Sequence, residues 1–274
     1  MMAALASFLV FVGLAGLLGG LAAQRRLAGL TVPGGWPRWW AASALLILVG
    51  TALQVGTTLV VLGFTAPADV LDYLTTTGPG RAALITLLGT ALLLAAGVGG
   101  WPAWLSVGLA GLSAAITLWG LAGQGHGAEH GTLTRLAHAT HAGLMALWVG
   151  GVAALWSGRP SDWPGNARAF TPLAVVCVVG LVLSGLVMSL EHAGPLAEWV
   201  DQPYDQLLLV KLGVFVVTLL AAQEVREHLT QSSRPRLALM LELILLLVVL
   251  GLTAVLVNSA PPSHNSEEMQ QMHM

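Results

Sequence analysis

Charged side chains are scarce in this sequence. They make up 9% of its 274 residues, whereas hydrophobic residues make up 56%. An ordinary soluble domain has roughly 25% charged and about 45–50% apolar residues. This balance excludes a soluble globular domain, and the formal net charge of -2 gives no basis for a nucleic-acid-binding surface. The composition instead predicts a membrane protein.

Cysteine is almost absent as well. Cys177 is the only cysteine, so the chain has neither a disulfide framework nor a CxxC metal or redox motif. Because Cys177 lies inside an apolar run, we expect it to be a small buried hydrophobic residue. The sequence also lacks the GxxxxGK[ST] motif of a phosphate-binding loop. Any transport would therefore be passive or coupled to an ion gradient.

Long apolar runs are the main feature that remains. A membrane-spanning helix needs about 20 mainly apolar residues. Eight segments qualify: 2–23, 39–64, 81–99, 101–122, 133–157, 168–190, 205–223 and 237–258. Two of these come from one apolar stretch, in which Gly-Gly followed by Pro102 predicts a break. The expected fold is all-α, a polytopic membrane protein with eight transmembrane helices.

Basic residues and tryptophans predict the orientation of these helices. The first, third, fifth and seventh loops hold eight of the eleven basic residues: Arg25, Arg26, Arg38, Arg159, Arg168, Arg226, Arg234 and Arg236. Tryptophans cluster at the same ends of the spans: Trp36, Trp39, Trp40, Trp101, Trp104, Trp156 and Trp163. The positive-inside rule then places these loops in the cytoplasm and both termini outside. The first segment has no basic residue ahead of its apolar run, so we interpret it as a retained anchor.

The fifth span carries two imidazoles within LTRLAHATHAGLMALW, residues 133–148. At about 100° per residue, an arc of roughly 80° on one helix face holds four side chains: His138, His141, Met145 and Trp148. Ionisable residues inside a membrane indicate a functional site, and imidazole with thioether suits a soft or borderline ion, copper above all. The alternative is that the histidines are packing groups that bond to a neighbouring helix.

Other soft donors lie on the same predicted outer side. Met188 and His192 are one turn apart at the end of the sixth span, and His126 and His130 flank a glutamate in a glycine-rich loop. The tail beyond residue 262 holds further candidates: His264, Met269, Met272, His273 and Met274. We interpret these groups as copper ligands or copper-gathering residues. An interfacial methionine, solvated histidines and a disordered polar tail are the alternatives.

A few other polar residues lie inside the spans. Lys211 is about 9 Å below the outer end of the seventh span at 1.5 Å per residue, a depth similar to that of the histidines. It either faces the copper pathway, extends its amine to the surface or pairs with a carboxylate. Gln54 and Glu242 are expected to form hydrogen bonds between helices. Gly16 and Gly20 form a GxxxG motif that predicts close helix packing.

The C-terminal half resembles the CopD family of bacterial copper-resistance inner-membrane proteins, over about residues 133–262. Four stretches carry the resemblance: HAGLMALWVGG (141–151), AFTPLAVVCVVGLVLSGL (169–186), YDQLLLVKL (204–212) and ELILLLVVLGLTAVLVNSAPP (242–262). The family's histidine, tryptophan, glycine pair and lysine fall on His141, Trp148, Gly150, Gly151 and Lys211. The family's Tyr-Gly-Arg is replaced here by residues 204–206, Tyr-Asp-Gln, so no role of that arginine carries over.

This resemblance implies an eight-helix protein that moves copper across the inner membrane beside a periplasmic CopC-type partner. The corresponding division of the chain is an N-terminal membrane half (1–132), a CopD-like half (133–262) and a Met/His-rich periplasmic tail (263–274). We expect copper to be imported along the His/Met stripe as cargo rather than changed by an enzyme reaction. Methionine favours Cu(I) over Cu(II).

A second family shares part of this pattern. The HemJ-type protoporphyrinogen oxidases also resemble the chain, because they place a helix histidine seven residues before a tryptophan and a lysine in a later helix. That resemblance implies haem b ligated by His141 and a membrane redox enzyme. We rank it below CopD because the Met/His tail suits copper and the four C-terminal stretches follow CopD. A copper sensor or chaperone that does not transport is a third reading.

Overall fold

The computed structural model describes residues 1–27, 29–64, 66–124, 131–159, 163–192, 199–200, 202–231 and 235–259. These residues form helices and their connections, without a strand in the described ranges. The helices are α1 (Met2–Leu14), η1 (Ala15–Gly19, a π-helical segment), α2 (Gly20–Arg26), α3 (Trp36–Val61), α4 (Pro67–Thr76), α5 (Gly78–Val98), α6 (Ala103–Ala122), α7 (Thr132–Ser157), α8 (Trp163–His192), α9 (Pro203–Gln231) and α10 (Pro235–Leu256).

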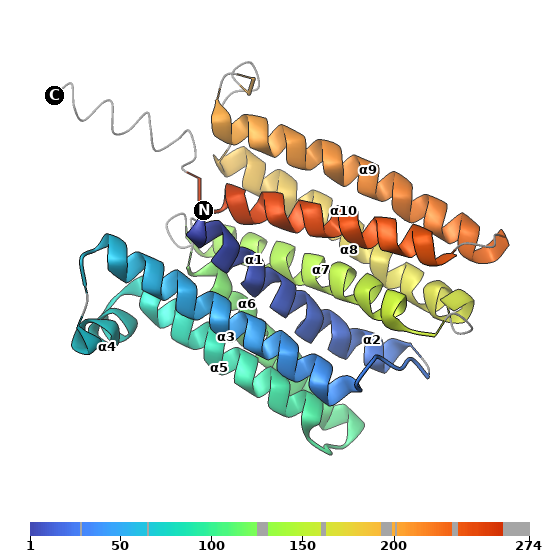
Figure 1. The fold of residues 1–274 in the computed structure, drawn as a ribbon, viewed down its shortest axis with the longest axis horizontal. Coiled ribbons are helices and arrows are strands. Elements are labelled where there is room, and N and C mark those ends of the chain that lie inside the picture. The colour runs from blue at the N-terminus through green and yellow to red at the C-terminus, as the bar shows by residue number, and fades with distance from the viewer. Residues whose placement is uncertain are drawn as a thin grey trace.

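Eight helices are long and apolar enough to cross a membrane, which confirms the predicted number within the described residues. The first span is α1, η1 and α2 in continuous succession, Met2–Arg26. The predicted break near Pro102 is also confirmed, because α5 ends at Val98 and α6 begins at Ala103. The axes of the spans run side by side in one bundle (Figure 1).

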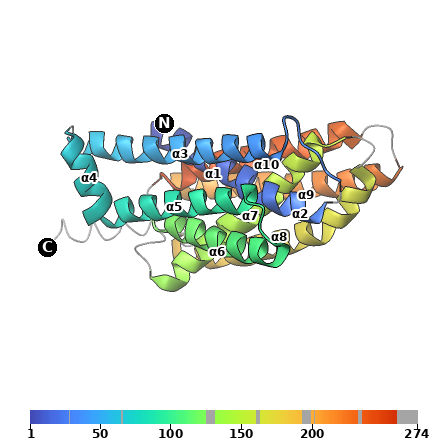
Figure 2. The same cartoon turned by 90° about the horizontal axis from the view of Figure 1, so that it is seen from below.

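The short helix α4 was not predicted. It lies across the ends of α3 and α5 instead of running beside them (Figure 2). Pro67 occupies its first turn, and the Asp69 carboxylate accepts a hydrogen bond from the Ala66 backbone N–H at 2.9 Å. These are N-terminal signals of a helix, but ten residues are too short to have been considered as a span.

Helix α7 lies at the centre of the bundle. In its most apolar stretch 61% of the residues are buried, against 22% in α3, α6, α8 and α9. It packs against α8, α6, α10 and the first span. Among the spanning helices, α7 therefore has the most buried apolar stretch.

Glycines allow the first span to approach its neighbours closely. A Cβ on Gly19 would lie 2.6 Å from the Gly150 Cα, so the backbones of the first span and α7 are nearly in contact. On another face, the Gly16 carbonyl accepts a hydrogen bond from the Trp39 indole at 2.8 Å, and a Cβ on Gly20 would meet the same indole at 2.6 Å. The GxxxG motif therefore packs closely against α3, as predicted.

The first span begins and α10 ends at the same end of the bundle, which we call the terminal end. There the Ser7 hydroxyl oxygen accepts hydrogen bonds from the Gln54 and Asn258 side-chain amides at 3.1 and 3.0 Å. These bonds join α1, α3 and the end of α10, and they confirm the interhelical role predicted for Gln54. Cys177 is free and fully buried, as expected.

Candidate metal site

A cavity of about 220 Å³ lies at the terminal end of the bundle. All spanning helices except α9 contribute to its lining, and Tyr73 of α4 and Gln124 also line it. The cavity is thus built from both halves of the chain. The sequence analysis had placed candidate ligands only in the second half, in the 126–130 loop and in the tail.

Four predicted soft donors line this one cavity. His138, His141 and Met145 reach it from α7, and Met188 reaches it from α8. Met145 is 6% exposed, so its thioether lies in the protein interior. Helix geometry accounts for the first three, because residues spaced three and four apart share one face. The juxtaposition of Met188 depends on how α8 packs on α7.

Neutral polar groups that the sequence analysis did not assign to a site also line the cavity. Gln54, Thr57 and Thr58 come from α3, whereas Ser7 and Asn258 come from the ends of the chain. A glutamine within an apolar span was a visible signal for Gln54. Asn258 and Ser7 carried none, since an asparagine just after a helix and a single serine inside an apolar span are both ordinary.

The donor set is unusual for a metal site. Among the described residues that line the cavity, none is Asp, Glu, Lys or Arg, and the described part of the chain contains no group of three His, Cys, Asp or Glu side chains that could hold a metal. A metal ion in this cavity would therefore depend on methionine sulfur together with imidazole nitrogen. Such donors favour copper, whereas magnesium and calcium require oxygen donors.

His141 is held in place by α8. Its Nδ1 lies 2.9 Å from the Ser184 Oγ, and the Ser184 hydroxyl lies 2.6 Å from the Gly180 carbonyl oxygen within α8. Ser184 is 8% exposed. The sequence analysis missed this serine because nothing in a serine within an apolar span shows which side chain it faces.

Lys211 lies near the cavity but does not line it. It is half-buried on α9 and is near enough to His141 for their charges to interact. A cation there would repel a metal ion bound by the histidine. The role of Lys211 in a pathway remains a prediction.

Trp148 lies deeper on the same face of α7, seven residues or roughly 10 Å beyond His141. It is 1% exposed, and its indole N–H donates a hydrogen bond to the Glu242 carboxylate at 3.2 Å. The Phe215 ring packs edge-on against it, with ring centroids 6.1 Å apart. Trp148, Phe215 and Glu242, which we call the tryptophan layer, join α7, α9 and α10. The interhelical hydrogen bond predicted for Glu242 is confirmed.

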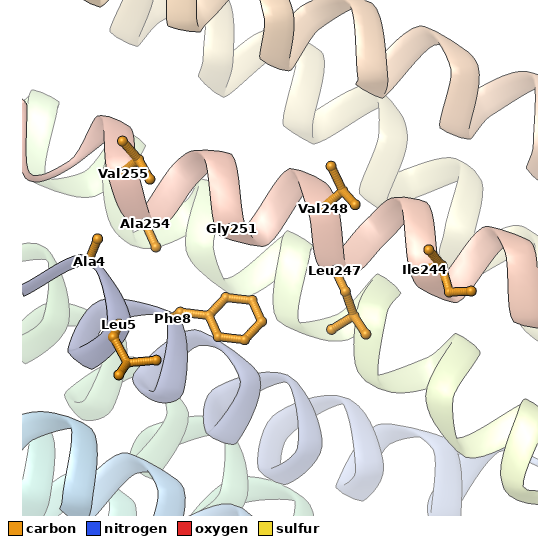
Figure 3. Close-up of a pocket in the computed structure, with 9 residues that line it drawn as sticks. All are labelled: Ala4, Leu5, Phe8, Ile244, Leu247, Val248, Gly251, Ala254 and Val255. Carbon is orange, nitrogen blue, oxygen red and sulfur yellow. The ribbon is translucent and has the colours of Figure 1, made fainter. Parts of the chain in front are cut away.

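A second hollow lies between α1 and α10 and differs completely in chemistry. Its labelled side chains, among them Phe8 and Leu247, are all hydrocarbon (Figure 3). No side chain there offers a nitrogen, oxygen or sulfur donor. This hollow is therefore no candidate for a metal site.

The remaining predicted ligands are not placed. The described residues do not include His126, His130, His264, Met269, Met272, His273 and Met274. His192 ends α8, and its side chain also lies outside the description. Their roles stay predictions.

Comparison with known proteins gives one match. The model of the family Copper resistance protein D (CopD) matches residues 164–256. That range contains α8, α9 and α10 almost entirely, including Ser184, Met188 and Lys211, whereas α7 with its two histidines precedes it. No curated protein and no solved structure matches the chain. The chain is therefore a multi-pass membrane protein whose C-terminal half matches the copper resistance protein D family over residues 164–256, as the resemblance predicted.

Proposed function

We propose that this protein imports copper across the bacterial inner membrane and that the cavity at the terminal end is its binding site. The observation that carries the proposal is the convergence of His138, His141, Met145 and Met188 on one cavity in a chain with a CopD domain. No catalytic step on the ion is part of this proposal.

The donor set favours Cu(I) as the cargo. Thioether sulfur is a soft ligand that selects Cu(I), and imidazole also binds copper well. The absence of a charged side chain among the described lining residues removes the attraction that would concentrate hard divalent cations. A transported ion must also leave, so a site of a few neutral ligands is more suitable than a cage of carboxylates or thiolates.

The terminal end faces the periplasm in this proposal. The loops at the other end of the bundle carry most of the basic residues, and the positive-inside rule assigns that end to the cytoplasm. Copper would then be gathered by His126, His130 and the tail residues 263–274, with a CopC-like protein as donor, and passed by way of His192 to the cavity. Ser259→Cys, labelled in intact spheroplasts by a membrane-impermeant maleimide, tests this orientation, because the native Cys177 is fully buried. Labelling only after lysis would contradict it.

The tryptophan layer separates the cavity from the cytoplasmic end. Trp148 is almost fully buried, so onward movement of copper requires its indole to shift. Lys211 would shorten the residence of the ion by repulsion from the side of α9. The closed layer also favours the second candidate function, a copper sensor or chaperone that binds copper without passing it on.

A haem group fits the cavity poorly. Sites for drug-sized ligands have volumes of about 300–1,000 Å³, and a haem macrocycle is at least of that size, whereas this cavity measures about 220 Å³. The HemJ-type alternative, with His141 as haem ligand, would need a wider site between α7 and α8 than the packed interface provides.

Proteoliposomes test the proposal. We expect Cu(I), supplied with a reductant, to accumulate in vesicles that contain the wild-type protein and to remain near the level of empty vesicles with His141→Ala. A visible spectrum of the same samples should lack a Soret band. Copper binding without uptake would support the sensor or chaperone, and a Soret band lost in His141→Ala would support the haem enzyme.

A further inference from the structure

Ser184 and His141 meet at the interface between α7 and α8. The imidazole edge that carries Nδ1 and Cε1 faces α8, because a Cβ placed on Gly185 would lie 3.6 Å from Cε1 and 3.9 Å from Nδ1. The Ser184 Oγ is 2.9 Å from Nδ1. Helix α8 therefore orients the ring, and the same side chain lines the cavity.

The single hydroxyl hydrogen of Ser184 already has a partner within its own helix. Its Oγ lies 2.6 Å from the Gly180 carbonyl oxygen and 3.3 Å from that of Leu181, and both carbonyls can only accept. A serine hydroxyl has one hydrogen and two acceptor lone pairs. Because the hydrogen is donated within α8, Oγ must accept the bond from His141. The hydrogen-bond network therefore assigns the proton to Nδ1.

We infer that Ser184 is a positioning residue that holds His141 in its Nδ1-protonated tautomer, so that Nε2 presents its lone pair to the copper ion. A neutral imidazole has one N–H and one lone pair, and a metal takes the nitrogen without hydrogen. Histidines that bind metals commonly donate their other N–H to a fixed partner, which sets the tautomer and the ring orientation. Ser184 supplies that partner to His141. Ser184 lies within the range that the CopD family model matches, and His141 lies before it.

This inference rests on the proposed function, and the tautomer can be measured separately from transport. Nitrogen NMR of the full chain in detergent, labelled with ¹⁵N-histidine and free of copper, reports which ring nitrogen carries hydrogen. The eight histidines are separated by a difference spectrum against His141→Gln. We expect a protonated Nδ1 and an unprotonated Nε2 for His141. Ser184→Ala should give a mixture of tautomers, and Ser184→Thr should restore the wild-type signal.

Copper affinity provides the second measurement. Competition with a chromophoric Cu(I) chelator should show a loss of about 10-fold in Ser184→Ala, the lower end of the range for removing a partner of a metal-binding histidine. Ser184→Thr should stay within about twofold of wild type, because it retains the hydroxyl. Ser113→Ala is the matched control, since Ser113 is 4% exposed and bonds in the same way to the Leu109 carbonyl at 2.6 Å on α6.

Two results would overturn the inference. A His141 signal with hydrogen on Nε2 in the wild-type protein contradicts it whether or not any variant folds. Unchanged affinity and tautomer in Ser184→Ala contradict it as well. If wild-type His141 carries hydrogen on Nδ1 but the protein binds no Cu(I), the proposed function fails together with the metal-binding half of the inference, and the tautomer assignment stands.

Discussion

Two regions along one face of α7 differ in their packing: the part near the terminal end and the part deeper in the bundle. At the terminal end, His138, His141 and Met145 line a cavity whose lining is uncharged among the described residues. Seven residues beyond His141 and three beyond Met145, Trp148 is packed against Phe215 and bonded to Glu242 with almost no exposed surface. One helix face thus changes from ligands beside open space to a dense aromatic layer.

This difference indicates a division between binding and sealing. A cavity that retains a cation needs unused lone pairs, whereas a layer that blocks leakage needs its polar atoms bonded to each other, since unsatisfied groups inside a membrane are costly. The two regions should therefore respond differently to substitution. Changes in the cavity should affect copper, and changes in the layer should affect stability.

The largest effect is expected from the double substitution His138→Ala with His141→Ala. Removing both imidazoles should lower Cu(I) affinity at least about 100-fold, because loss of even an outer-shell partner costs 10–100-fold. Chelator competition measures it, and the melting temperature in detergent should change little. Affinity within threefold of wild type would place the copper site elsewhere, such as the tail.

Substitutions of Glu242 test whether the tryptophan layer contributes to stability and not to copper binding. Glu242→Leu leaves the buried Trp148 N–H without that acceptor, which costs about 1–3 kcal/mol of unfolding free energy, whereas Glu242→Gln retains an acceptor oxygen. Thermal unfolding followed by circular dichroism should therefore rank the leucine variant below the glutamine variant. Both should bind Cu(I) as the wild type does. Equal stability of the two variants would show that the bond is not structural.

Cu(I) affinity should depend on the methionine in the cavity and not on one outside it. Met145→Leu removes a buried sulfur from the cavity lining, and Met240→Leu removes one from a position that is 36% exposed. Leucine is nearly isosteric with methionine, so both variants should fold. We expect about a 10-fold loss of Cu(I) affinity, or about 1.4 kcal/mol, for Met145→Leu alone. Equal affinities would remove sulfur from the site.

The smallest effect concerns the tail. Deletion of residues 264–274 should slow copper uptake at low external copper and leave uptake at high copper unchanged, because a gathering segment raises the local ion concentration without forming the cavity. Uptake by proteoliposomes over a range of copper concentrations tests this. A uniform decrease at all concentrations would instead make the tail part of the transport path.

Much of the fold could be predicted because hydrophobic length is a strong signal. Eight spans and the break before Ala103 follow from the need to bury about 20 apolar residues in each crossing. The stripe of His138, His141 and Met145 also follows, since local helix geometry alone determines which side chains share a face. The short helix α4 was not predicted, because it depends on capping and not on hydropathy.

The remainder of the site depends on contacts between distant segments. Ser7 and Asn258 are 251 residues apart, yet both line the cavity and bond to each other. Ser7 lies inside α1 and Asn258 just after α10, and neither residue type signals a site at such a position. The pairings of Ser184 with His141 and of Glu242 with Trp148 depend likewise on the rotation of each helix about its axis. Hydropathy does not determine that rotation, which is set by packing against neighbouring helices.

X-ray absorption at the copper edge tests the central claim most directly, namely that imidazole and thioether in the cavity bind copper together. The sample is the protein without residues 264–274, loaded with one equivalent of Cu(I), beside the same protein carrying Met145→Leu and Met188→Leu. We predict nitrogen and sulfur neighbours around copper in the first sample and loss of the sulfur contribution in the second. A first shell without sulfur, or one that the two methionine substitutions leave unchanged, would contradict the account.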